Sequence, residues 1–485
     1  MSKRIAKRSD SSRRIAKRIV VERGTYHDSV TLMLASRDAE ATEGIVFAAA
    51  AAATPVNLEL LEGRGFELPG DLVPDDLLIA IEGTDEAAVD AAAAAIEARL
   101  SARPRAAEDS TVVAPRSLRS AGRRDPGIDL AFVSVPGRFA AYEVANALDA
   151  GLNVFCFSDG VSLEAEVALK RRAADAGLLV MGPDCGTAII SGVALGFANV
   201  VRRGPVGIVG ASGTGTQEIC CLLDVAGVGI SHAIGVGGRD LSAPVGGLMT
   251  IAGIELLARD PETEIIIVVS KPPAAAVAER VLAVVQAARK PFVLALLGAG
   301  DLGGADAVAT LEAAAGRAAE LAGGHLLLEE SVIERATPGE VVGLFTGGTL
   351  CEEAGAIVAA AGLESRFSDF GDDEMTAGRA HPMIDPTLRN EALTRETAGS
   401  AGVIVVDVVL GHGAHPDPAT GLAPLIRSAL ATRGDTLTII ATVCGTEGDP
   451  QGLGAQMSAL SEAGAVVTRS AASAGRLAVA AGGGA

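Results

Sequence analysis

Short apolar runs alternate with longer mixed segments along most of the chain. The runs predict buried strands, the segments between them predict helices, and the short connections imply parallel strands with right-handed crossovers. Strands are expected at residues 130–135, 152–157, 177–186, 206–209, 231–236, 264–270, 291–297, 341–345, 402–407 and 437–444. Because the runs are almost entirely apolar, both faces of their sheets are expected to be covered. The expected fold class is α/β, with a Rossmann-like domain followed by two flavodoxin-like, doubly wound domains.

The first part of the chain predicts a separate, smaller α/β unit. Residues 29–36 and 77–81 are interpreted as strands, and an alanine-rich segment near 86–102 as a helix. Residues 101–120 carry two prolines and many charges and form the first expected linker. The expected division is a basic tail at 1–20, a small domain at 21–110, the Rossmann-like domain at 111–202, and the doubly wound domains at 203–333 and 334–485.

Composition narrows the classes of function. The formal net charge of −20 argues against nucleic acid as the main partner. The longest apolar run, at 45–53, is far below the roughly 20 residues that cross a bilayer, and no cleavable signal is expected. The cysteines are scattered without metal-ligand spacing, which predicts a reducing cytoplasm and no metal centre. They are Cys156, Cys185, Cys220, Cys221, Cys351 and Cys444.

The first twenty residues contradict the acidic average. They hold eight basic side chains against one acid, Asp10, and the run RIAKR occurs at 4–8 and again at 14–18. The segment has too few apolar residues to bury, which favours a solvated extension. A basic helix that docks on an acidic partner or a neighbouring subunit is the alternative.

The most informative stretch lies at 205–218, where an apolar strand is followed by a small-residue turn and a helix. The turn consists of Ser212, Gly213, Thr214, Gly215 and Thr216. Glycines let the backbone approach a ligand, the first helical amides lack intrahelical partners, and the helix dipole favours an anion there. An ordinary N-capped connection is the equal alternative.

The order of these segments resembles the succinyl-CoA synthetase superfamily. Residues 182–188 and 207–218 look like the alpha-subunit segments that contact coenzyme A and the travelling phosphate. Residues 343–349, with Gly347, Gly348 and Thr349, look like the phosphate-facing loop of the beta subunit. Over residues 21–450 the chain more closely resembles the FdrA family. The motifs that carry this likeness lie at 25–30, 231–242, 371–376, 381–386 and 410–418.

Departures from the synthetase pattern change the expected chemistry. Those alpha subunits carry a phosphorylated histidine after the fourth strand of this domain, whereas residues 296–307 contain no histidine. Lys271 stands where they carry an acidic residue that steadies the phosphohistidine, and no ATP-grasp region is present. The resemblance therefore implies no phosphohistidine relay by this chain alone.

The resemblance implies instead one phosphate between two helix starts, at 212–216 and 347–349. Arg239 or Lys271 is expected to help hold an acyl phosphate and to stabilise the leaving phosphate without a covalent intermediate. FdrA-family proteins are associated with allantoin and oxamate catabolism, as one subunit of an oxamate-type carbamoyltransferase. Carbamoyl phosphate and a carboxylate or amide acceptor are therefore the implied small molecules.

Two other functions stay open. An acyl-CoA synthetase subunit would bind coenzyme A near Pro136, Ser158, Asp184 and Cys185 and would borrow phosphorylation from a partner. A scaffold or regulator would keep the folds without chemistry. Coenzyme A is the possible cofactor of the first alternative only.

Polar residues near the end of the chain form two candidate clusters. Arg379 and His381 are expected to bind the acceptor, and the acidic residues of the loop at 369–385 are expected to orient them. The alternatives for this loop are a binding site for a cation or a set of solvated charges. The second cluster follows an expected strand end, where α/β sheets bind ligands, and is a candidate for proton transfer or metal ligation. It comprises Asp407, His412, His415 and Asp417.

Partner subunits are expected as well. No nucleophile with its base is expected at both phosphate-facing loops. The basic tail and the small amino-terminal domain are the candidate docking surfaces. The chain is therefore expected to act in an oligomeric assembly on small molecules.

The isolated chain is predicted to acquire no stable phosphate from labelled ATP or GTP. The reason is the missing histidine in residues 296–307 and the missing ATP-grasp region. The measurement is radiolabel retained by the purified protein. Acid-labile, base-stable label would contradict the prediction, since a phosphohistidine behaves in that way.

Overall fold

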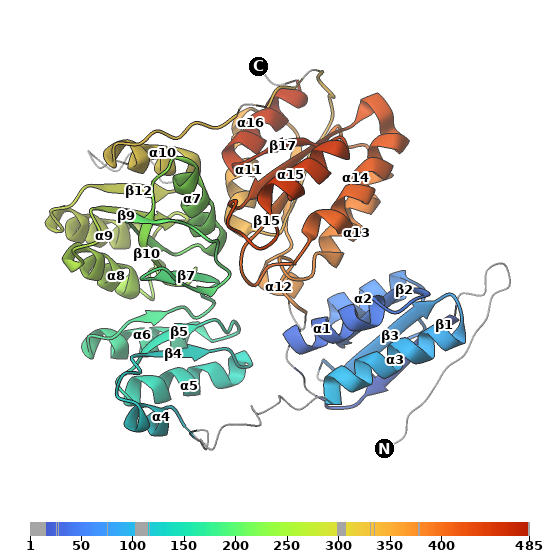
Figure 1. Cartoon of the computed structure of the whole chain (residues 1–485), viewed down its shortest axis with the longest axis horizontal. Helices are drawn as coiled ribbons and strands as arrows, with labels where there is room; N and C mark the ends of the chain where they lie inside the picture. Colours follow the sequence, from blue (N-terminus) through green and yellow to red (C-terminus); the bar gives the residue numbers. More distant parts are fainter. Residues whose placement is uncertain are drawn as a thin grey trace. The chain divides into compact units, whose positions relative to one another are not determined.

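A computed structural model describes residues 16–25, 27, 29–74, 76–101, 115, 117–297, 307–329, 331–333, 335–376 and 379–483. It divides into two compact units, coloured along the chain in Figure 1. Unit 1 comprises Met1–Ala114 with Gly371–Asp385, and unit 2 comprises Pro115–Phe370 with Pro386–Ala485. Among the described residues, no helix has the length and apolar character needed to cross a membrane. Residues 102–114 and 116 of the expected linker at 101–120, and residues 1–15 of the expected tail, lie outside the described residues.

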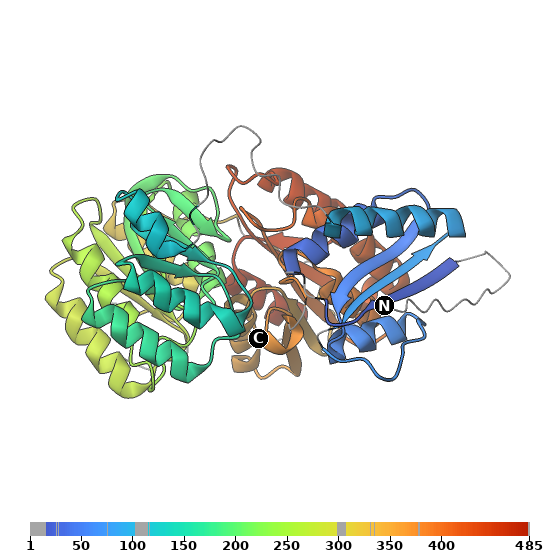
Figure 2. The same cartoon turned by 90° about the horizontal axis from the view of Figure 1, so that it is seen from below.

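Unit 1 contains an antiparallel sheet with a buried cluster on each face. Its strands β1 (Ala16–Glu22), β2 (Ile45–Ala52) and β3 (Leu77–Gly83) lie in the order β1-β3-β2. Helices α1 (Ser29–Glu40) and α3 (Glu86–Ser101) bury apolar residues against one face, and α2 (Pro55–Gly63) contributes Leu61 to the cluster on the other, as Figure 2 allows the reader to follow. A short helix, α12 (Asp373–Thr376), belongs to the second segment of this unit.

Two expectations for this unit were wrong. Residues 29–36 form helix α1 and no strand; Leu32, Ala35 and Ala39 recur at helical spacing and are buried. Residues 16–20, assigned to the basic tail, belong to strand β1. Their charges have partners there, because Arg18 forms an ion pair with Asp90 at 2.6 Å.

Unit 2 contains three sheets, as expected for one Rossmann-like and two doubly wound domains. The first is parallel, in the order β4-β5-β6, with β4 (Leu130–Val133), β5 (Asn153–Cys156) and β6 (Val180–Met181). The second has the order β12-β11-β9-β10-β7-β8, with β7 (Thr187–Ile190), β8 (Val193–Gly196), β9 (Arg203–Gly210), β10 (Ile230–Gly235), β11 (Ile265–Ser270) and β12 (Phe292–Leu296). The third is parallel, in the order β14-β13-β15-β16-β17, with β13 (Val341–Phe345), β14 (Ser365–Asp369), β15 (Val403–Val409), β16 (Thr438–Cys444) and β17 (Val466–Thr468).

The helices of unit 2 alternate with these strands. The first sheet has α4 (Leu118–Arg124), α5 (Gly137–Asp149) and α6 (Leu163–Asp175). The second has α7 (Gly213–Val225), α8 (Leu248–Arg259), α9 (Ala275–Ala287) and α10 (Leu311–Leu321). The third has α11 (Gly348–Ala360), α13 (Thr387–Thr397), α14 (Pro418–Arg433), α15 (Leu453–Glu462) and α16 (Ala471–Ala481). The antiparallel hairpin β7–β8 was not expected from the apolar pattern.

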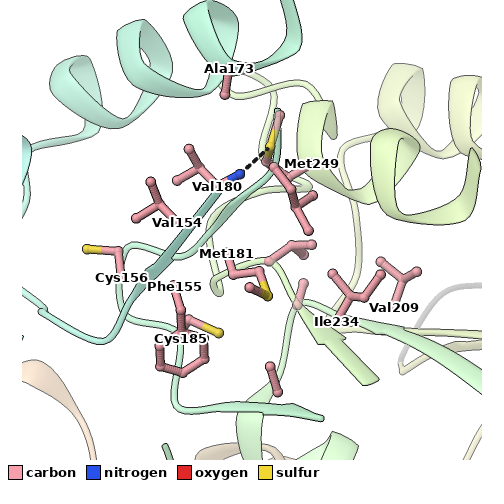
Figure 3. Packing of buried hydrophobic residues seen from close by; sticks show 14 of the residues in the cluster. Val154, Phe155, Cys156, Ala173, Val180, Met181, Cys185, Val209, Ile234 and Met249 are labelled. Atoms are coloured by element: carbon pink, nitrogen blue, oxygen red, sulfur yellow. Dashed lines mark hydrogen bonds between the residues drawn. The ribbon is translucent and has the colours of Figure 1, made fainter. Parts of the chain in front are cut away.

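The first two sheets of unit 2 share one hydrophobic core. Val154 and Met181 of the first sheet belong to the same buried cluster as Val209 and Ile234 of the second. Figure 3 shows Met249 of α8 reaching toward the first sheet, where the Val180 amide donates a hydrogen bond to Met249 Sδ at 3.2 Å. The position of the first sheet relative to the second is therefore fixed by packing.

A buried group of charges adds a second connection between these two domains. Lys170 of α6 is fully buried, and its Nζ donates to Glu166 Oε1 at 2.8 Å, Asp240 Oδ1 at 2.9 Å and the Val236 carbonyl at 2.8 Å. Asp240 also accepts from the Thr250 amide at 2.8 Å, at the start of α8. The lysine therefore neutralises carboxylates from both domains.

Replacing Lys170 by Met is predicted to lower the free energy of unfolding by about 3–5 kcal/mol, because it leaves the buried Asp240 without its cationic partner and leaves Glu166 with Arg239 alone. The measurement is urea denaturation followed by circular dichroism. Arg172→Met in the same helix is the matched control, since Arg172 forms an exposed ion pair with Asp149 that is worth about 1 kcal/mol or less. Equal losses in the two variants would contradict the prediction.

Candidate active site

The first expected turn is the start of α7. Ser212 is the N-cap residue, and its Oγ accepts a hydrogen bond from the Gly215 amide at 3.0 Å. Thr216 Oγ1 donates to the Ser212 carbonyl at 2.6 Å. The helix thus begins at Gly213, earlier than the expected opening at Gln217. Among the described residues, the Gly213 and Thr214 amides have no acceptor, as is usual for the first amides of a helix.

The second expected turn is the start of α11. Gly347 is its N-cap, without a side-chain cap. The buried carboxylate of Asp407, on β15, accepts from the Thr346 amide at 2.7 Å and from the Gly347 amide at 2.8 Å. Burial raises the pKa of Asp407, while Arg389 and these donors oppose that rise. We had assigned Asp407 to the histidine cluster; a lone carboxylate inside an apolar strand was the signal for this buried capping role.

The structure brings the two helix starts into direct contact. Ser212 Oγ and Thr349 Oγ1 are 2.6 Å apart. A Cβ atom added to Gly347 would lie 2.9 Å from Thr214 Cγ2, and one added to Gly215 would lie 3.1 Å from Thr349 Cγ2. Glycine at these two positions therefore permits the close approach.

The hydroxyl pair leaves one proton for a ligand. Ser212 Oγ already accepts from the Gly215 amide, and one of the two hydroxyls must donate to the other. Each hydroxyl has a single proton, so one proton closes the pair and the second is free to point elsewhere. Together with the amides of Gly213, Thr214 and Gly348, this proton gives a set of donors suited to an anion.

Two buried carboxylates lie farther along the same helices. Glu218 of α7 accepts from the Ala471 amide, at the start of α16, at 3.1 Å. Glu353 of α11 accepts from the Leu311 amide, at the start of α10, at 2.6 Å. Burial raises the pKa of both carboxyls, that of Glu353 to about 7. Sequence reasoning missed this pair, although both residues stand six positions after the N-cap of their helix.

The two expected cationic residues already have acidic partners. Lys271 forms an ion pair with Glu352. Arg239 lies 2.8 Å from Glu166 and donates to the Val161 carbonyl at 2.7 Å. Their contribution to anion binding stays a prediction.

The expected acceptor residues belong to unit 1, except that Asp369 of the same loop belongs to unit 2. Arg379 lies 3.8 Å from Asp385, and His381 Nδ1 accepts from the Met383 amide at 3.2 Å. Burial lowers the pKa of His381 to about 4, which makes the imidazole neutral at neutral pH. Binding of an acceptor by Arg379 and His381 stays a prediction.

The residues expected to contact coenzyme A follow the strands of the first sheet. Pro136 is the N-cap of α5, and Ser158 Oγ accepts from the Val135 amide at 2.9 Å. Asp184 has a positive φ of 56° in the loop after β6. The Cys185 thiol is in the buried core of Figure 3, where it donates to the Thr187 carbonyl at 3.5 Å, and burial raises its pKa. A coenzyme A site here stays a prediction, and its best-placed donors are the first amides of α5.

The expected histidine cluster does not form a metal centre within the described residues. Asp417 caps α14 through the Thr420 amide, and its own amide donates to His415 Nδ1 at 3.1 Å. The His412 amide donates to the Ala198 carbonyl at 2.8 Å, which joins two loops of unit 2. These contacts are structural.

Three family profiles match the chain. They are described as "AllF, heavy metal-associated domain" over residues 15–115, "CoA binding domain" over 201–298, and "CoA-ligase" over 344–481. The second match lies in the six-stranded sheet, whereas we expected a coenzyme A-binding type of domain at 111–202. Residues 15–115 contain no cysteine, so the thiolates that soft heavy metals prefer are missing from that region.

Curated relatives fall into two groups. YahF of Escherichia coli (strain K12) is 40% identical over 504 aligned positions, which cover 95% of this chain and 98% of that protein. Succinate–CoA ligase [ADP-forming] subunit alpha 1 of Archaeoglobus fulgidus is 33% identical over 147 residues, and malate–CoA ligase subunit alpha of Methylorubrum extorquens is 31% identical over 150. These matches cover 30% and 29% of this chain and 49% of each ligase subunit, so the chain spans about half the length of these relatives.

Among solved structures, the chain is similar to dinucleotide-forming acetyl-coenzyme A synthetase 1 of Ca. Korarchaeum cryptofilum, which was solved in complex with phosphate and ADP. The identity is 17% and the TM-score 0.34, over 73% of this chain and 82% of that one. This degree of likeness supports no conclusion about function.

The pH dependence of stability is predicted to reflect Glu353. The pKa of Glu353 is about 7 in the folded protein and near 4.5 in the unfolded chain. The stability that Glu353 gains from binding a proton in the folded state is therefore fully present below about pH 4.5 and is lost as the pH rises through 7. Glu353→Gln keeps an oxygen for the Leu311 amide but cannot ionise. The fall in melting temperature from pH 5 to pH 8 should therefore be smaller in this variant than in the parent protein.

Glu352→Gln is the matched control, because the neighbouring Glu352 side chain is exposed and pairs with Lys271. This variant should keep the pH dependence of the parent protein. The same pH dependence in the parent and in Glu353→Gln would show that the buried carboxyl does not titrate as predicted.

Proposed function

We propose that this chain is an acyl-transfer subunit that holds an acyl phosphate at the paired starts of α7 and α11. The chain belongs to the family of Escherichia coli YahF, within the succinyl-CoA synthetase-like group of coenzyme A-binding acyl-CoA ligases. The observation that carries the proposal is the 2.6 Å contact between Ser212 and Thr349. Two helix ends with free amides meet there, and both dipoles favour the same anion.

The chemistry follows from what these groups stabilise. An acceptor attacks the carbonyl carbon of the acyl phosphate, the bond from that carbon to the phosphate oxygen breaks, and phosphate leaves with the electron pair. The acceptor gives up one proton. Hydroxyl and amide donors around the phosphate stabilise the charge that develops on the leaving group, which lowers the barrier without a covalent enzyme intermediate.

The acyl group that we propose is carbamoyl, on the basis of the resemblance to the FdrA family. The acceptor is then an oxamate-like carboxylate or amide, as in ureide catabolism, and partner subunits complete the site. Lys271 and Arg239 are the cations that we propose for the site, although each has an acidic partner. No phosphorylated histidine is needed in this scheme.

The second candidate is transfer of the acyl group to the thiol of coenzyme A. It is favoured by the two family profiles that name coenzyme A, over residues 201–298 and 344–481. The amides at the start of α5 and the Ser158 loop would hold the cofactor's phosphates. The phosphate site at Ser212 and Thr349 is common to both candidates, so ligand choice separates them.

Ser212→Ala and Thr349→Val are predicted to weaken binding of carbamoyl phosphate and of inorganic phosphate about tenfold or more each. A hydrogen bond to a charged group is worth about 1.5–3 kcal/mol. The measurement is calorimetric titration, and the double variant should depart from the sum of the two single losses, because the hydroxyls touch. Titration with coenzyme A in parallel separates the two candidate acceptors.

Thr310→Ala is the matched control, since Thr310 caps α10 through the Ala313 amide and does not belong to the paired starts of α7 and α11. It should lose about 1 kcal/mol of stability, as Ser212→Ala does, and bind phosphate unchanged. Strictly additive losses would show that the two helix starts do not share a ligand. Binding of coenzyme A without carbamoyl phosphate would favour the ligase candidate.

A further inference from the structure

A buried hydroxyl beside α7 has no partner. Thr187 begins strand β7 and is 2% exposed. Its Oγ1 makes no hydrogen bond within the described part of the chain. Burying a hydroxyl without a partner costs free energy, so such a group calls for an explanation.

The position of this hydroxyl relates it to the anion site. A Cβ atom added to Gly213, the first residue of α7, would lie 3.5 Å from Thr187 Oγ1 and 3.9 Å from the Gly186 α-carbon. The Gly213 amide also lacks an acceptor among the described residues. The Thr187 hydroxyl and residue Gly213 therefore lie next to each other, and each carries a donor without an acceptor among the described residues, which the oxygens of one bound anion would satisfy.

The backbone around Thr187 is held firmly. The Cys185 thiol donates to the Thr187 carbonyl at 3.5 Å, and a Cβ atom added to Gly235 would lie 2.3 Å from that same carbonyl. Residues of β7 pair with β8 on one side and with β10 on the other. The hydroxyl is therefore kept beside Gly213 by the sheet itself.

We infer that Thr187 is a third hydroxyl of the anion site, which binds an oxygen of the phosphoryl or acyl group together with the Gly213 amide. This inference rests on the proposed function, since it needs an anion at the start of α7. It assigns a binding role to strand β7, which β8 and β9 separate from the glycine-rich turn along the chain, in addition to the roles of Ser212 and Thr349. The ligand class is a small phosphate-containing anion.

Thr187→Val tests this inference, with Thr187→Ser to restore the hydroxyl. The probes are inorganic phosphate and carbamoyl phosphate in calorimetric titration. Thr187→Val should bind about tenfold more weakly, and Thr187→Ser should bind within about twofold of the parent. Without ligand, Thr187→Val should melt at or above the parent temperature, because it removes an unpaired buried hydroxyl.

Thr442→Val is the matched control. Thr442 is also fully buried with an unpaired Oγ1, but it lies in β16 of the third sheet, opposite Asp407. This variant should bind both probes as the parent does, and it should melt at or above the parent temperature for the same reason as Thr187→Val. A structural role for Thr187 would instead lower the melting temperature of Thr187→Val.

The outcomes separate this inference from the function on which it rests. If Ser212→Ala weakens phosphate binding and Thr187→Val does not, the role of Thr187 is overturned and the anion site stands. If the parent binds neither probe, or Ser212→Ala binds as well as the parent, the proposed function fails and the inference fails with it. Weak binding by Thr187→Val with recovery in Thr187→Ser supports both.

Discussion

The contact between the starts of α7 and α11 is the constraint on which unit 2 depends. Two helix ends that meet at Ser212 and Thr349 place two partial positive charges together, which is unfavourable in the absence of an anion. The buried carboxylate of Asp407 offsets part of this repulsion, because it accepts hydrogen bonds from two amides of the second turn.

The two doubly wound domains are held in this arrangement by further polar contacts. Asn199 Nδ2 donates to Asp449 Oδ2 at 2.8 Å and to the Leu410 carbonyl at 3.0 Å, and the Val200 amide donates to Asp449 Oδ1 at 2.7 Å. Glu218 and Glu353 each bind the first amide of a helix in the other domain. Because these groups are buried, a shift of one domain would leave several polar atoms unpaired, which favours one fixed register.

The sequence predicted the three sheets of unit 2 and both glycine-rich turns, because long apolar strands and small-residue turns are local signals. It failed at residues 29–36, where apolar residues fit strand and helix alike until Leu32 and Ala35 are seen to face one core. It also could not reveal Thr187, Glu218 or Glu353 as neighbours of the turns. Glu218 and Glu353 bind amides that lie 253 and 42 positions away, and the Thr187 hydroxyl stands out only by a hydrogen bond that it does not make among the described residues. Neither feature leaves a periodic pattern in the sequence.

The overall charge of the chain makes this local geometry important. A protein with a formal net charge of −20 repels anions at long range, although salt screens that field beyond about 10 Å. The two cations proposed for the site, Lys271 and Arg239, are already paired with Glu352 and Glu166. In the proposed function, an anionic ligand must therefore gain its binding energy at contact distance, from amides and hydroxyls whose positions are set by Gly215 and Gly347. Such donors discriminate by shape, because a hydrogen bond falls off with angle and distance far more steeply than the attraction to a flexible cation.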